Sequence, residues 1–207
     1  MHRHARALKY NYNPAQLRDE IGRWTDTGAG QRVRLTSSDT PRLGPRSKLA
    51  IAIEAARHAI KLFRDRNLLR DMFGQKEGTV AYTEVNEVAI YGISSDSPEF
   101  RDRDVVAAER LRGDLIAKYP DDMARENVGQ RPNDAVFHAE TTTLLRAARE
   151  NGGSLAGQSL EVHVDRPMCS SCDRILPLVG LELGDPTVTF IGPSRVPKTM
   201  RGGVWVK

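Results

Sequence analysis

The chain has few cysteines, few aromatic residues and no long apolar run, and each shortage excludes a class of protein. Its only two cysteines among 207 residues stand three positions apart, so they cannot form the disulfide framework of a small secreted domain. No apolar run approaches 20 residues, so no transmembrane helix is expected. The basic residues 1–6 are not followed by an apolar segment, so no signal peptide is expected. An apolar content of 39% is lean but compatible with a globular domain.

The positive charge is concentrated at the start of the chain. Residues 1–50 carry ten basic and four acidic side chains, whereas residues 51–207 carry 21 basic and 23 acidic ones. The basic balance therefore does not indicate a nucleic-acid surface on the second part. Residues 1–46 are also interrupted by proline and glycine and have no apolar periodicity, which predicts a flexible leader or linker, or a basic junction to another module. The folded domain is expected to span residues 47–207.

Apolar periodicity within 47–207 predicts an α/β fold with a mixed sheet of about five strands. Helices are expected over 47–70, 104–118, 138–151 and 169–179, the last kinked or broken at Pro177, and strands over 79–85, 87–94, 160–164, 187–191 and 204–206. The first two strands should form an antiparallel hairpin, because the connection at Asn86 is short. If 204–206 pairs with 187–191, the pairing should be antiparallel, since too little sequence separates them for a helical crossover.

Two short sequences carry candidate chemistry, and each begins a predicted helix. His138 and Glu140 belong to the first, and Cys169 and Cys172 to the second. About thirty residues separate them, enough for one helix–strand crossover that would bring both helix starts to one sheet edge. One imidazole and two thiolates suit zinc, and three ligands leave the fourth position open for water, as in catalytic sites. Glu140 is placed to act as general base and then general acid.

These sequences resemble the H-x-E…P-C-x-x-C pattern of zinc-dependent cytidine and nucleobase deaminases. The pattern stands here as His-Ala-Glu at 138–140 and Pro-Met-Cys-Ser-Ser-Cys at 167–172, with Met168 as an extra residue before the first cysteine. The resemblance covers roughly residues 47–207 and is closest to the deaminase domains of bacterial polymorphic toxins. It implies a cytidine deaminase-like three-layer fold, with helices packed on both faces of the sheet.

The resemblance also implies a function. His138, Cys169 and Cys172 would hold zinc, Glu140 would activate water, and hydroxide would attack C4 of cytosine, or C6 of adenine, with loss of ammonia. The expected substrate is cytosine in nucleic acid, DNA before RNA, in single or double strands. A monomeric toxin domain without membrane contact, opposed by an immunity protein, is implied. It would act in the bacterial cytoplasm or be delivered into a target cell by a specialised secretion system.

Six residues are candidates for substrate contact: Ser94, Ser95, Phe137, Ala139, Pro167 and Met168. The two serines follow the second predicted strand, where deaminases often place polar groups against the base. Phe137 could stack on a base or belong to the core. The side chains that could bind phosphates are Arg166, Arg174 and Lys198, although these could equally be ordinary surface charges.

Four other interpretations remain open at this stage. A deaminase of free nucleosides or nucleotides would suit the nearly neutral second part of the chain. A non-catalytic module stabilised by zinc is a second alternative, and a closed four-ligand zinc site that adds His163 is a third. The fourth is a thioredoxin-like redox pair formed by the two cysteines.

Overall fold

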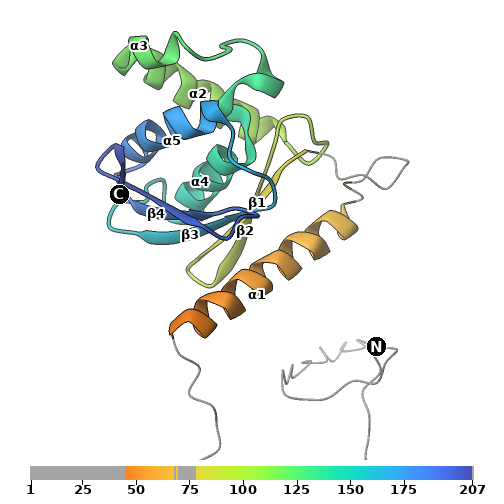
Figure 1. Ribbon diagram of the computed structural model, residues 1–207. Coiled ribbons are helices and arrows are strands. Elements are labelled where there is room, and N and C mark those ends of the chain that lie inside the picture. Colours follow the sequence, from red (N-terminus) through yellow and green to blue (C-terminus); the bar gives the residue numbers. More distant parts are fainter. Residues whose placement is uncertain (1–44, 68, 70–77, 207) are drawn as a thin grey trace, which may run out of the picture. The chain divides into compact units, whose positions relative to one another are not determined.

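The computed structural model describes residues 45–67, 69 and 78–206 (Figure 1). The predicted leader therefore lies outside the described residues, apart from its last two positions. Within the described ranges, no helix combines the length and the apolar composition needed to cross a membrane.

A six-stranded mixed sheet forms the middle of the fold. Its strands stand in the order β2-β1-β3-β4-β5-β6, and only β3 and β4 run parallel. Their bounds are β1 Val80–Val85, β2 Val88–Ile93, β3 Ser159–Val164, β4 Thr187–Ile191, β5 Pro197–Arg201 and β6 Val204–Val206. The predicted antiparallel hairpin of β1 and β2 is confirmed. Its turn residues, Asn86 and Glu87, both have positive φ, as a two-residue hairpin turn requires.

The prediction of about five strands was one strand short. The missed strand, β5, lies between β4 and β6, so 204–206 pairs with β5 and not with 187–191, and the condition under which an antiparallel pairing of those two segments was expected is not met. The sequence of β5 is Pro-Lys-Thr-Met-Arg, and only Met200 is buried. It lacks the alternation of apolar and polar residues by which a strand is recognised in a sequence. Its place in the sheet depends on pairing with both neighbours.

Helices cover both faces of the sheet (Figure 1). On one face, α1 (Pro45–Arg66) packs against β1 and β3. On the other face, α4 (Ala139–Glu150) packs against β1 and β2, and α5 (Ser170–Glu182) against β5 and β6. The remaining helices are α2 (Asp102–Lys118), the short α3 (Pro120–Met123), and the 3-10 turns η1 (Arg131–Asn133) and η2 (Ala135–Phe137).

The first helix ends at Arg66 rather than at Arg70, and two further differences in helix extent have identifiable reasons. The first helix begins at Pro45 rather than Ser47, because proline is well tolerated in the first turn. The last helix continues through Pro177 to Glu182 instead of breaking there. Proline removes the N–H that would bond the carbonyl of Asp173, four residues earlier. That carbonyl instead accepts a hydrogen bond from Trp205 Nε1 at 2.7 Å, which offsets the loss.

The main core lies between the sheet and the α4 and α5 layer, and a smaller cluster lies under α1. Gly92 of β2 sets the closest approach within the main core. A Cβ at this position would overlap the Thr143 hydroxyl and the Ala139 carbonyl oxygen, both in α4. Glycine therefore allows the first turn of α4 to lie directly on the hairpin.

The Gly92→Ala substitution should destabilise the fold by about 3 kcal/mol, the upper range for overpacking, because backbone atoms of α4 cannot move aside independently. Urea unfolding measures the change. The control is Gly113→Ala in α2, where a Cβ meets no atom within 4 Å and helix propensity should raise stability by about 0.8 kcal/mol. Equal stability of Gly92→Ala and the wild type would contradict the close approach.

Candidate active site

Two helices begin at the candidate metal centre with nearly identical geometry. His138 and Cys169 are the residues immediately before α4 and α5, and both have extended backbone, with φ near −80° and ψ near 164°. The Cys169 sulfur accepts a hydrogen bond from the Cys172 N–H at 3.3 Å, which caps α5. Both helix starts meet here, as the crossover argument predicted. Helix N-termini favour negative charge and therefore thiolates.

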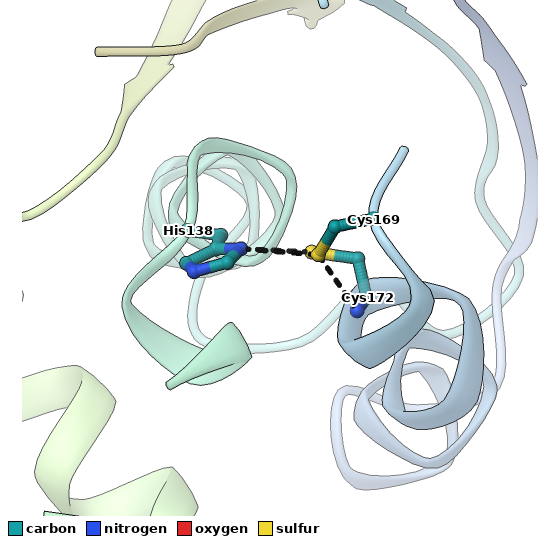
Figure 2. A group of neighbouring side chains, drawn as sticks. All are labelled: His138, Cys169 and Cys172. Atoms are coloured by element: carbon teal, nitrogen blue, oxygen red, sulfur yellow. Dashed lines mark hydrogen bonds between the residues drawn. The ribbon is translucent and has the colours of Figure 1, made fainter. Parts of the chain in front are cut away.

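The three predicted ligand residues converge (Figure 2). His138 Nδ1 lies 3.3 Å from Cys172 Sγ and 3.5 Å from Cys169 Sγ, and all three ligand atoms lie within 4.8 Å of one another. A tetrahedral zinc ion with ordinary bond lengths would separate such atoms by about 3.6–3.8 Å. The group can therefore hold a metal ion with little movement, and its imidazole and thiolate donors are compatible with zinc.

A hydrogen bond between the two cysteine side chains shifts their pKa values in opposite directions. A hydrogen bond from the Cys172 thiol lowers the pKa of Cys169 to about 4, and His138 lowers it further against the opposing effect of burial. The same hydrogen bond, together with burial, raises the pKa of Cys172. One thiolate is thus present at neutral pH, and metal binding would displace the remaining proton.

Glu140 lies in the first turn of α4, beside the cluster. Its side chain is buried, with only 3% of the residue exposed. Burial raises the pKa of Glu140, while its own backbone N–H, the His138 ring and a hydrogen bond with Cys172 oppose the rise. Its carboxylate is not part of the three-ligand group. The residue can therefore carry a proton next to the centre without being a ligand.

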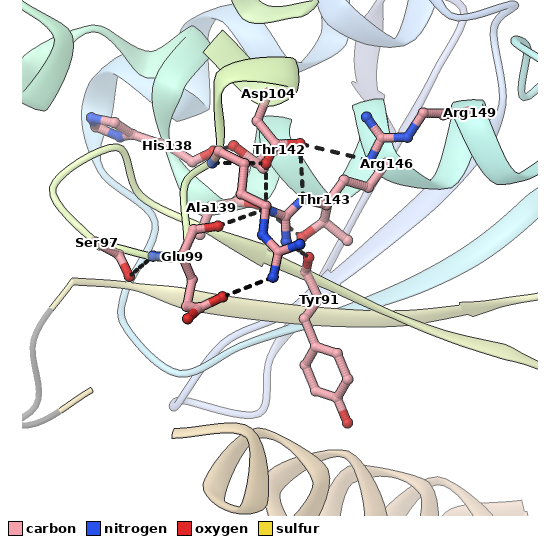
Figure 3. A network of polar contacts seen from close by, with 11 residues as sticks. Tyr91, Ser97, Glu99, Asp104, His138, Ala139, Thr142, Thr143, Arg146 and Arg149 are labelled. Atoms are coloured by element: carbon pink, nitrogen blue, oxygen red, sulfur yellow. Dashed lines mark hydrogen bonds and ion pairs between the residues drawn. The ribbon is translucent and has the colours of Figure 1, made fainter. Parts of the chain in front are cut away.

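An arginine on α4 fixes this helix to its surroundings (Figure 3). Arg146 donates hydrogen bonds to the backbone oxygens of Tyr91, at 2.6 Å, and Glu99, at 3.2 Å. It also forms a buried ion pair with Asp104 of α2, with an N–O distance of 2.5 Å. Within α4, Thr142 Oγ1 donates to the carbonyl of His138 at 2.9 Å. Arg146 thereby joins β2, the segment after it and α2 to the helix that presents His138.

The ion pair determines the ionisation of Asp104. Burial alone would raise the pKa of this carboxyl, but the hydrogen bonds and charge of Arg146, the Arg101 N–H and the charge of Arg149 together hold it below its usual range. Asp104 is therefore ionised at neutral pH although it is buried.

The candidates for base contact near His138 are mostly structural. Ser94 pairs with Thr79 through its Oγ and its N–H. Ser95 donates its N–H to the Phe137 carbonyl at 3.1 Å, and its buried Oγ has no hydrogen-bond partner among the described residues. Phe137 and Ala139 are completely buried. The Phe137 ring packs in the core near Phe100 instead of offering a face to a base.

Pro167 and Met168 directly precede the first cysteine. They line a hollow of about 470 Å³ that also borders Cys169. Arg166 and Lys198 line the same hollow, whereas Arg174 pairs with Glu126 elsewhere. Of the predicted contacts, Pro167 and Met168 therefore border open space, whereas Phe137 and Ala139 belong to the core and the two serines are half-buried.

His163 does not belong to the cluster. It is buried in β3 and lines a hollow under α1 together with Ile53 and Arg57. It is not among the ligand atoms that converge on the candidate centre. The closed four-ligand site that would include His163 is therefore not formed.

Two positioning features were not anticipated from the sequence. Arg146 and its partner Asp104 are 42 positions apart, and no local pattern connects them. Lys198 pairs with Asp173 at the start of α5 and lies 4.2 Å above the Trp205 ring. Together with the Trp205 hydrogen bond to the Asp173 carbonyl, this contact holds the β5–β6 hairpin against the helix that presents the cysteines.

We expect one zinc ion per chain, and either His138→Ala or Cys172→Ala should weaken its binding at least about 100-fold, because a ligand is lost. Metal content by mass spectrometry and competition with a chelator measure this. Glu140→Gln and His163→Ala serve as controls and should keep the metal. Unchanged affinity after loss of Cys172, or no zinc binding by the wild type, would refute the assignment.

Asp104→Asn should lower the free energy of unfolding by about 3–5 kcal/mol at pH 7, because Arg146 would lose its buried partner. The depressed pKa of Asp104 means that the stabilisation is present above the usual carboxyl pKa, near 3.9, and is lost as the pH falls through the lower folded-state value. The difference between variant and wild type should therefore shrink below about pH 4. Urea unfolding from pH 3 to 7 tests this.

The matched control is Asp114→Asn, an exposed position on the same helix, which should change stability by less than about 0.5 kcal/mol. A pH-independent difference for Asp104→Asn would contradict the role of its ionised form.

Comparison of the chain with protein-family models, with curated proteins and with solved structures finds no match. The function of this protein is therefore inferred from the geometry of the centre and from the His-x-Glu and Cys-x-x-Cys pattern.

Proposed function

We propose that this protein is a zinc-dependent hydrolytic deaminase that converts cytosine to uracil in nucleic acid. The observation that carries the proposal is the convergence of His138 Nδ1 with the sulfurs of Cys169 and Cys172 beside the buried carboxyl of Glu140. Three protein ligands with an adjacent proton carrier are typical of a catalytic zinc site, whereas a structural site has four ligands. A redox pair or a purely structural site gives Glu140 no role.

Zinc bound by these residues would supply hydroxide as a nucleophile at neutral pH. Glu140 would do the proton chemistry. Its raised pKa allows the carboxylate to accept a proton from the attacking water and to release it to the departing amino nitrogen. The starts of α4 and α5 favour the thiolate form of the two cysteines.

The arrangement of the fold is compatible with this reading. Both parts of the H-x-E and C-x-x-C pattern lie at helix starts, and β3–α5–β4 forms a parallel crossover unit. The six-stranded mixed sheet with helices on both faces supports the resemblance to the cytidine deaminase-like fold, although the sheet has one strand more than the apolar pattern predicted.

The choice of a polymer, with DNA before RNA, comes from the resemblance to the deaminase domains of bacterial toxins. As a toxin domain, the protein would damage a competitor's nucleic acid, and its producer would need an immunity protein. Arg166 and Lys198, which line the hollow next to Cys169, add support for a phosphate-bearing substrate. The target base must be unpaired or flipped out to reach the centre.

A deaminase of free nucleosides is the second candidate, and one observation favours it. Residues 51–207 carry 21 basic and 23 acidic side chains, so the domain has no overall positive field to attract a polymer. Salt separates the two candidates, because binding of a polymer weakens steeply with salt and turnover of a nucleoside hardly changes.

Zinc-loaded protein should convert cytosine to uracil within cytosine-containing DNA, with release of ammonia, and Glu140→Gln should reduce the rate by about 10²–10⁴-fold while keeping zinc. Mass spectrometry of digested product measures this for single-stranded DNA, duplex DNA, RNA and cytidine. The matched control is Glu150→Gln, an exposed position at the other end of α4, which should leave the rate unchanged.

Formation of uridine from cytidine, with no uracil formed in any polymer, would reassign the protein to nucleoside metabolism. Full activity of Glu140→Gln would reject the mechanism. Failure on all four substrates and on their adenine counterparts would reject deamination.

A further inference from the structure

We propose that the hollow beside Cys169 continues across the sheet edge onto α1 and binds the phosphates of a single-stranded nucleic acid. We call this surface the phosphate path and define it by Arg57, Lys61, Arg166 and Lys198, with Gly192 and Pro193 between them. As a route for the substrate it rests on the proposed function, but its binding can be measured separately.

Two hollows meet along this path. The first, of about 470 Å³, borders Cys169 and the start of α5. The second, of about 370 Å³, lies between α1 and the sheet. They share Val164 at the end of β3 and Gly192 and Pro193 after β4. A chain that enters beside the candidate centre can therefore continue onto α1 over the ends of the two parallel strands.

Arg57 connects the two sides. From α1, its Nη2 donates a hydrogen bond to the Pro193 carbonyl at 3.2 Å, while 38% of its side chain remains exposed. Its carboxylate neighbour is Glu54, at 3.5 Å, and Glu54 also pairs with Arg195 at 2.6 Å. The guanidinium is thus held at the junction of the hollows while part of it still reaches solvent.

Positive charge is concentrated along the path. Five cations and two carboxylates line the two hollows. The cations are Arg57, Lys61, Arg64, Arg166 and Lys198, and the carboxylates are Asp165 and Asp173. Arg64 and Asp165 form a buried ion pair, and Asp173 pairs with Lys198. Arg57 also pairs with Glu54, so the local excess is two positive charges, whereas residues 51–207 as a whole carry two more acidic than basic side chains. The cations are therefore gathered at this place.

The path has little to stack on a base. Phe190 is the one aromatic residue among those that line the two hollows, and it is buried. Proteins that hold bases along a strand use exposed aromatic rings, whereas a groove lined by cations follows the phosphates. Binding here should therefore tolerate any base sequence and depend strongly on salt. DNA and RNA share the phosphodiester chemistry that this surface recognises.

The test measures binding of a fluorescein-labelled 15-nucleotide DNA, and of the RNA of the same sequence, by anisotropy at several salt concentrations. The full chain is used with Glu140→Gln to prevent turnover, so any contribution of the basic residues 1–46 is common to all variants. Lys61→Glu and Arg57→Glu should each weaken binding roughly fivefold or more at 0.1 M salt and lower the salt slope by about 0.7.

The control is Lys48→Glu. Lys48 is an exposed cation on the same helix, about 180° around the axis from Arg57, and it lines neither hollow. The Lys48→Glu variant should bind the labelled DNA and RNA with the same affinity as the parent chain. Lys61→Gln repeats the test without a reversed charge, and thermal unfolding verifies that each variant folds.

The outcomes separate this inference from the proposed function. Losses at Lys61 and Arg57 but not at Lys48 support the path, even if no substrate is deaminated, and the tighter of the two polymers names the ligand. Equal affinities of all variants, equal losses at Lys48, or no salt-dependent binding of either polymer overturn the path, even if deamination is observed.

Discussion

The candidate site depends on how α4 is fastened to the rest of the fold, and the Arg146 guanidinium makes the decisive contacts. It binds two backbone carbonyls after and within β2 and the buried carboxylate of Asp104. A buried charge of this kind is tolerable only when its hydrogen bonds are satisfied, so the helix has one favourable position. Gly92 then lets the first turn of α4 approach the hairpin closely. The contacts of Arg146 and the close approach at Gly92 together determine where His138 and Glu140 lie.

The cysteine side of the centre is held by a different device. The start of α5 is fixed by Trp205 and Lys198, both of which contact Asp173 from the β5–β6 hairpin. The Trp205 hydrogen bond also satisfies the carbonyl that Pro177 leaves without its helical donor. Two independent supports therefore bring the imidazole and the thiols together, and the three ligand atoms can converge without a covalent link between α4 and α5.

The surroundings of the centre differ on its two sides, and this difference bears on how a substrate would enter. Around His138 the neighbours are core residues, with Phe137 and Ala139 completely buried. Before Cys169, in contrast, Pro167 and Met168 border an open hollow lined by cations. Electrostatic attraction along one edge can coexist with a nearly neutral domain, because fields near a surface are set by local charges and are screened within about 10 Å.

The sequence by itself determined the local parts of this protein. The hairpin, the helix periodicity and the His138, Glu140, Cys169 and Cys172 pattern at helix starts could be predicted, because turns, caps and amphipathic faces arise from neighbouring residues. Only the tertiary structure decided that β5 separates β4 from β6, that His163 faces α1, that Phe137 is core and that Asp104 neutralises Arg146. These contacts join segments distant in sequence, and their free energy comes from burial and charge pairing that no local pattern encodes.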